Sequence, residues 1–126
     1  MTDDETRGLA ASGAVAGLAP TTEADLGDGT FAARAYLDAG GAFGVGSDSN
    51  TIIDPFAELR QLEWSQRLAR AVAQRARDRR TRRSGTRSMR AAARGGAQRD
   101  GRRAGAIAPG CRADLVVLDT DGSGAR

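Results

Sequence analysis

The sequence predicts an α/β fold, and three observations lead to this prediction. Helical and strand-like patterns alternate over residues 1–76 in the order helix, strand, helix, strand, helix. Both strand-like runs are short and apolar, which suits buried strands. The chain between them is long enough for the right-handed crossover that joins two parallel strands. This order is typical of an α/β barrel or of a doubly wound sheet.

The first expected helix has a clear start signal. Thr2 and Glu5 have the spacing of a capping box, in which each side chain binds the backbone N–H of the other residue. A short helix is therefore expected to run from the N-cap Thr2 to Ser12. Gly13 is expected to stop it, because glycine readily adopts the backbone conformation that follows a helix.

The two expected strands flank a second helix. Residues 14–18, AVAGL, predict the first strand, which Pro20 ends. The polar, glycine-containing run 21–29 predicts a loop. Residues 31–39 predict a helix that two glycines close, and residues 42–46, AFGVG, predict the second strand.

A longer helix is expected from Asp54-Pro55 onward, because Asp is a good N-cap and Pro is tolerated at the first helical position. Apolar residues recur at helical spacing through about residue 76. They are Phe56, Leu59, Leu62, Leu68 and Val72. The charged residues are expected on the solvent-exposed surface of this helix, with Glu63 and Arg67 at a favourable spacing for an ion pair. These surface charges are Glu58, Arg60, Glu63 and Arg67.

Residues 77–103 interrupt this order. The stretch 75–103 holds twelve arginines and two acidic residues, with almost no large apolar side chain. Such a segment cannot bury enough apolar surface to offset its ordering entropy, so poor order is expected. Its charge leaves one alternative function open, which is non-specific binding of nucleic-acid phosphates. The stretch has no aromatic residue to stack on bases, so any such binding would be non-specific. Charge runs are usually solvated, so a nucleic-acid partner is not expected.

Order is expected to return in residues 104–120. The run Ala113–Asp119, ADLVVLD, is rich in β-branched residues and follows a Pro-Gly turn, which together predict a strand. The tail 121–126 is expected to be disordered.

Composition excludes several classes of function. The chain has no histidine, and all 19 of its basic residues are arginine, so a serine nucleophile would lack a histidine or lysine base. The single cysteine, Cys111, excludes a disulfide within one chain. The glycines around Val45 lack the spacing of a nucleotide-binding loop. No signal peptide or membrane-spanning run is evident, so no membrane contact and a cytoplasmic setting are expected.

Three blocks of the sequence resemble one family. They are SGAVAGLAPTTEADLGDGTF, GGAFGVGSDSNTIIDPFAELRQLEWSQRLAR and GAIAPGCRADLVVLD. Together they resemble the C-terminal part of the formimidoylglutamate deiminases, which belong to the amidohydrolase superfamily. The third block is shared widely across that superfamily, whereas the Pro-Thr-Thr-Glu and Gly-Ser-Asp-Ser-Asn loops of the first two resemble the deiminases in particular.

The resemblance implies a (β/α)8 barrel with a small accessory β-sandwich. Residues 1–76 would form the last barrel units, with 14–18 as the seventh strand and 42–46 as the eighth. Residues 104–120 would supply a strand of the sandwich, and residues 77–103 fit the family poorly.

Asp48 aligns with the carboxylate that follows the eighth strand in this superfamily. By resemblance it ligates a catalytic zinc ion and exchanges a proton with the metal-bound water. Zinc lowers the pKa of such a water to about 7, so that it is a nucleophile at neutral pH. The implied reaction hydrolyses the formimino group of N-formimino-L-glutamate, a small molecule of histidine degradation, to N-formyl-L-glutamate and ammonia.

The remaining zinc ligands of the family are histidines on earlier strands, and this chain has no histidine. A barrel of this kind also needs about 250 residues. We therefore expect the chain to be a C-terminal part of such an enzyme and to be inactive alone. The resemblance also implies a homodimer for the complete enzyme, and it places Asp25 where related enzymes commonly carry asparagine. It identifies no substrate-binding residue in this chain.

Overall fold

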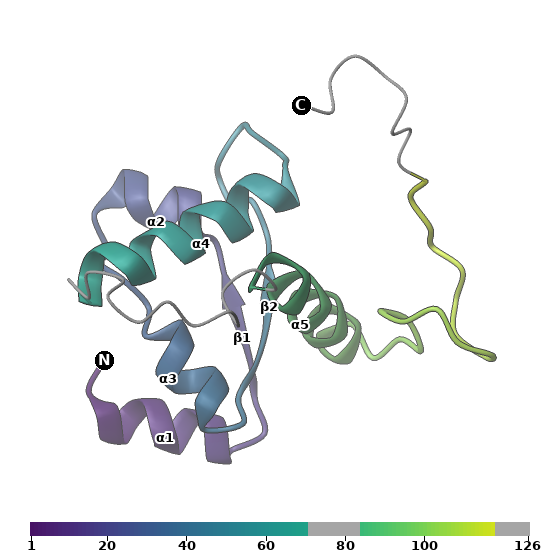
Figure 1. The fold of residues 1–126 in the computed structure, drawn as a ribbon, viewed down its shortest axis with the longest axis horizontal. Helices are drawn as coiled ribbons and strands as arrows, with labels where there is room; N and C mark the ends of the chain where they lie inside the picture. The colour runs from purple at the N-terminus through teal and green to yellow at the C-terminus, as the bar shows by residue number, and fades with distance from the viewer. Residues whose placement is uncertain (71–83, 118–126) are drawn as a thin grey trace.

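A parallel pair of strands forms the centre of the fold (Figure 1). The computed structural model describes residues 1–70 and 84–117. Strand β1 (Val15–Leu18) pairs in parallel with β2 (Ala42–Val45), first residue to first and last residue to last. Both predicted strands are thus confirmed, each shortened by one residue.

Five helices lie in the described residues. In Figure 1 the strands lie between α5 and the other four helices. The helices are α1 (Asp3–Ala11), α2 (Pro20–Leu26), α3 (Ala33–Asp38), α4 (Pro55–Arg70) and α5 (Ser84–Arg99). The three helices predicted over 1–76 correspond to α1, α3 and α4. None of the helices described here is long and apolar enough to cross a membrane.

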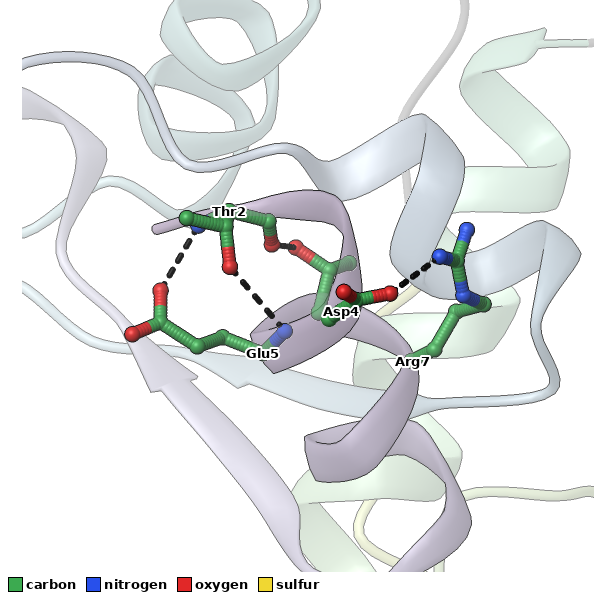
Figure 2. A network of polar contacts seen from close by, with 5 residues as sticks. Thr2, Asp4, Glu5 and Arg7 are labelled. Carbon is green, nitrogen blue, oxygen red and sulfur yellow. Dashed lines mark hydrogen bonds and ion pairs between the residues drawn. The ribbon is translucent and has the colours of Figure 1, made fainter.

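The predicted capping box at the start of α1 is confirmed (Figure 2). The Thr2 N–H donates to Glu5 Oε2 at 2.7 Å, and the Glu5 N–H donates to Thr2 Oγ1 at 3.3 Å. Figure 2 also shows the ion pair between Asp4 and Arg7 one turn along the helix. The capping box therefore satisfies two of the free backbone donors at the start of α1, those of Thr2 and Glu5.

This capping box makes the stability of α1 depend on pH. The backbone and side-chain hydrogen bonds of Thr2 lower the pKa of Glu5 below its ordinary value. The resulting stabilisation is fully present above the pKa of an unfolded glutamate, and it is lost as the pH falls through the lowered pKa. We expect Thr2→Ala to raise the pKa of Glu5 part of the way back, as measured by NMR titration of its carboxyl group. Thr2→Ser keeps the hydroxyl and should keep the pKa low, so equal values in both variants would contradict this account.

Helix α2 corrects one expectation, because residues 21–29 were expected to be a loop. Pro20 occupies the first helical position, where its missing N–H has no hydrogen-bond partner to lose. Glu23 Oε1 accepts the Ala19 N–H at 2.8 Å, and Gly27 ends the helix with a left-handed φ of 74°. The loop prediction is wrong for residues up to Leu26, since Pro20 starts a helix as well as ending a strand.

The core lies between the strands and the helices packed on them. Tyr36 and Phe43 are fully buried. The Tyr36 hydroxyl lies 2.9 Å from the carbonyl oxygen of Ala14 and 3.1 Å from that of Ala42, at the starts of the two strands. The buried apolar residues are Ala10, Leu18, Ala33, Tyr36, Phe43, Leu59, Leu62 and Ala92.

The start of α4 is as predicted. Asp54 Oδ1 accepts the Phe56 N–H at 2.8 Å, which confirms Asp54 as the cap. The predicted pair of Glu63 with Arg67 is also confirmed, with an N–O distance of 2.8 Å. Both side chains of this pair are partly exposed, so its contribution to stability is small.

The predicted apolar face of α4 is confirmed only in part. Leu59 and Leu62 are buried in the core, whereas Phe56 is 52% and Leu68 is 81% exposed. Val72 lies outside the described residues. The buried stripe is therefore narrower than the apolar pattern of the sequence.

Helix α5 corrects a second expectation, because residues 77–103 were expected to be poorly ordered. Residues 84–99 form a helix instead. Arg, Ala and Met are strong helix formers, so the local preference is helical although large apolar residues are few. The arginines at positions 90, 94 and 99 are exposed, so their charges stay in water.

Small residues let α5 lie directly on β2. Ala92 and Gly95 are buried. A Cβ atom on Gly95 would clash with the backbone carbonyl of Phe43, so the helix backbone touches the strand backbone there. This close approach explains how a helix with so few large apolar side chains remains packed.

The C-terminal stretch corrects a third expectation. Residues 113–117 of the predicted strand 113–119 form no strand, and residues 118–119 lie outside the described ranges. Leu115, Val116 and Val117 are 62%, 86% and 92% exposed. Strand preference depends on neighbouring strands, and within residues 1–70 and 84–117 no strand pairs with this stretch. The predicted tail 121–126 also falls outside the described residues.

Candidate active site

The turn after β2 carries Asp48. The Asn50 N–H donates to the Ser47 carbonyl oxygen at 2.9 Å, which closes a four-residue turn over 47–50. Asp48 has a φ of 49°, a left-handed conformation that Asp tolerates better than most residues. Its side chain is exposed. The turn therefore presents the carboxylate to solvent.

The position of this turn in the sheet matters for function. The Gly46 N–H donates to the Leu18 carbonyl oxygen at 2.9 Å, so the pairing of β1 with β2 continues to the edge of the turn. The carboxyl ends of parallel strands meet at one edge of a sheet. In α/β proteins, catalytic and ligand-binding groups gather at this edge.

Helix α2, which follows β1, holds this turn through two hydrogen bonds. Thr22 Oγ1 donates to the Ser47 carbonyl oxygen at 2.8 Å, and Asn50 Nδ2 donates to Asp25 Oδ2 at 3.1 Å. Thr22 is 4% exposed, so water competes little for the first bond. The two residues that flank Asp48 and Ser49 are thus both bound to one helix.

A buried carboxylate in turn holds α2. Glu58 of α4 is 2% exposed. Its Oε2 accepts the Thr21 N–H at 2.9 Å, and its Oε1 accepts the Thr21 hydroxyl. The prediction that Glu58 is a surface charge is therefore wrong. A buried charge is costly unless it is hydrogen-bonded, and the start of α2 supplies these bonds.

The structure does not combine Asp48 with further metal ligands. Within residues 1–70 and 84–117, no group of three or more His, Cys, Asp or Glu side chains could hold a metal ion. Asp25 lies across the turn, but its Oδ2 accepts from Asn50. Zinc sites commonly have three or four protein ligands. The residues of the described ranges therefore do not by themselves fit the implied zinc ion.

Two surface hollows lie elsewhere. One of about 570 Å³ lies between α4 and α5, and one of about 280 Å³ lies between α2 and α4. Asp48 lines neither of them. These hollows therefore do not identify substrate-binding residues for Asp48.

Sequence reasoning singled out Asp48, whose catalytic role stays a prediction, but missed Thr22 and Glu58. A signal for Glu58 was present, because it lies one helical turn before Leu62 and so shares its inward face. No comparable signal marked Thr22. Its partner Ser47 lies 25 residues away in the chain, and only the crossover brings the two together.

A parallel strand–helix–strand unit with a tethered carboxylate after a strand defines an α/β protein with a candidate catalytic edge. The chain belongs to the amidohydrolase family, whose sequence profile matches residues 2–125. It is 47% identical over 123 residues to formimidoylglutamate deiminase of Pseudomonas aeruginosa, covering 91% of this chain. The chain spans about a quarter (25%) of the length of that relative. The predicted family resemblance is thereby confirmed.

A solved structure gives a consistent result. The crystal structure of an amidohydrolase from Brucella melitensis matches 90% of this chain and 25% of its own, with a TM-score of 0.73 and 44% identity. The family match spans the arginine-rich segment as well, so it does not favour the alternative of a separate nucleic-acid-binding segment.

Proposed function

We propose that this chain forms part of a metal-dependent (β/α)8 amidohydrolase that hydrolyses N-formimino-L-glutamate to N-formyl-L-glutamate and ammonia. In this proposal residues 1–76 are the last barrel units, with β1 and β2 as the seventh and eighth strands. Residues 104–120 contribute to the accessory sandwich. The observation that supports the proposal most directly is Asp48, held at the carboxyl edge of the strands in a chain 47% identical to a formimidoylglutamate deiminase.

In this reaction Asp48 would move a proton. Water adds to the formimino carbon, and the terminal nitrogen leaves as ammonia. The Asp48 carboxylate accepts a proton from the attacking water and passes it to the leaving nitrogen, and the second proton of the water reaches the same nitrogen as the C–N bond breaks and the C=O bond forms. Its exposure on a fixed turn suits both transfers, because the group must reach water and substrate from one position.

The metal requires residues from outside this chain. Asp48 offers one ligand, and the sequence has no histidine to complete the set. We therefore propose that the 126-residue chain alone is inactive and that the other ligands belong to the rest of a complete enzyme. A cytoplasmic setting and a homodimer are further parts of this proposal.

The experiment that tests the proposal is a chimera. The chain would replace the quarter of the Pseudomonas aeruginosa deiminase that it matches, and ammonia release from N-formimino-L-glutamate would be measured together with bound metal. We expect the chimera to release ammonia and to bind metal, and the 126-residue chain alone to do neither. An inactive chimera that is folded and loaded with metal would contradict the proposal.

A further inference from the structure

We infer that Thr22 and Glu58 are positioning residues, which hold Asp48 in place through helix α2. This inference rests on the proposed function for its catalytic meaning. In the proposed reaction, neither Thr22 nor Glu58 contacts the reacting atoms. Together with Thr21 and Ser47, Thr22 and Glu58 form a set that we call the α2 tether.

The tether joins three elements through hydrogen bonds at two neighbouring residues of α2. Glu58 on α4 binds the N–H and hydroxyl of Thr21 at the start of α2. Thr22, the next residue, donates to the Ser47 carbonyl oxygen at 2.8 Å. Ser47 directly precedes Asp48 in the chain, so the tether ends at the peptide group that sets the position of Asp48.

Burial of its side chains limits the motion of the tether. Glu58 is 2% exposed and Thr22 is 4% exposed. Both are surrounded by protein, so loss of either bond would leave a buried polar group without a partner. The second link from α2 to the turn, between Asp25 and Asn50, is exposed and is therefore weaker.

The backbone conformation of Asp48 explains why the turn needs the tether. Its φ of 49° is a conformation that a free turn would populate only in part. The Ser47 carbonyl accepts from the Asn50 N–H within the turn and from Thr22 across to α2. The second bond fixes the turn against the sheet edge, and a misplacement of about 1 Å in a catalytic group can cost about 100-fold in rate.

The test uses variants that change the bonding and keep the size. Thr22→Val removes the hydroxyl donor, and Thr22→Ser restores it. Glu58→Leu removes both acceptors, whereas Glu58→Gln can still accept the Thr21 N–H and donate to its hydroxyl. Glu63→Gln is the control, since Glu63 lies on the same helix and pairs only with Arg67 among the described contacts.

The first measurement needs no activity. In the 126-residue chain we expect amide hydrogen exchange at Asn50 to become about 10-fold faster in Thr22→Val and Glu58→Leu, relative to Gly41 as an internal reference. The Gly41 N–H binds the Tyr36 carbonyl at 2.9 Å, away from the tether. Exchange should keep its original rate in Thr22→Ser, Glu58→Gln and Glu63→Gln. Unchanged exchange in Thr22→Val would overturn the inference, whether or not the chimera is active.

The second measurement uses the chimera. We expect kcat to fall about 10- to 100-fold in Thr22→Val and Glu58→Leu, with KM changed less than about 3-fold, and the three conservative variants to keep kcat. Faster exchange with an unchanged kcat would overturn the positioning role. If the unsubstituted chimera is folded and loaded with metal but inactive, the proposed function fails, and the exchange measurement alone still decides whether the tether holds the turn.

Discussion

Substituting Asp48 by Asn should reduce ammonia release by the chimera by about 1,000-fold. The amide cannot accept and return the proton, although its size and shape are nearly those of the carboxylate. Asn also tolerates a left-handed backbone, so the φ of 49° at this position should persist. The loss should therefore appear in kcat without a change in thermal stability, as measured by steady-state kinetics and by thermal unfolding.

Ser49→Ala is the matched control for this substitution. Ser49 is the next residue in the same turn and is exposed. Its loss should change kcat by less than about 3-fold, because it has no role in the proton transfers that we assign to Asp48. If Asp48→Asn keeps more than a tenth of the activity, the assignment of Asp48 is wrong.

The second large effect concerns stability. Gly95→Ala should destabilise the 126-residue chain by about 3 kcal/mol, the upper part of the range for overpacking a core. The added Cβ would meet the backbone carbonyl of Phe43, and backbone atoms cannot move aside as a flexible side chain can. Helix α5 would have to separate from β2. Urea unfolding followed by circular dichroism measures the change.

The neighbouring glycine provides an internal control. A Cβ on Gly96 meets no atom within 4 Å. Because Ala favours a helix interior over Gly by up to about 1 kcal/mol, Gly96→Ala should leave the stability unchanged or raise it. Equal effects of the two substitutions would show that α5 does not lie against Phe43 as described.

The elements that sequence reasoning predicted correctly have local causes. The Thr2–Glu5 capping box, the Asp54 cap and the two apolar strands each depend on residues a few positions apart. The polar turn that carries Asp48 was also readable locally, because it follows an apolar strand. The role of Asp48 came from the family resemblance and stays a prediction.

Of the features that sequence reasoning missed, helix α5 and the α2 tether depend on small residues or on contacts between distant residues, whereas the start of α2 has a local signal. Pro20 both follows the end of a strand and starts a helix, and sequence reasoning overlooked only the helix start. Helix α5 is packed through Gly95 and Ala92, which a search for large apolar residues does not detect. The α2 tether joins residues 25 and 37 positions apart, so no local pattern could reveal it.

The exposed run Leu115–Val117 has a practical consequence for handling the chain. Consecutive β-branched and aliphatic side chains in water are prone to self-association into intermolecular sheets. The nearest described acidic residue, Asp114, is paired with Arg112 and adds little repulsion between chains. Solubility should therefore fall as the protein concentration rises, and a low concentration is the condition in which the chain is best studied.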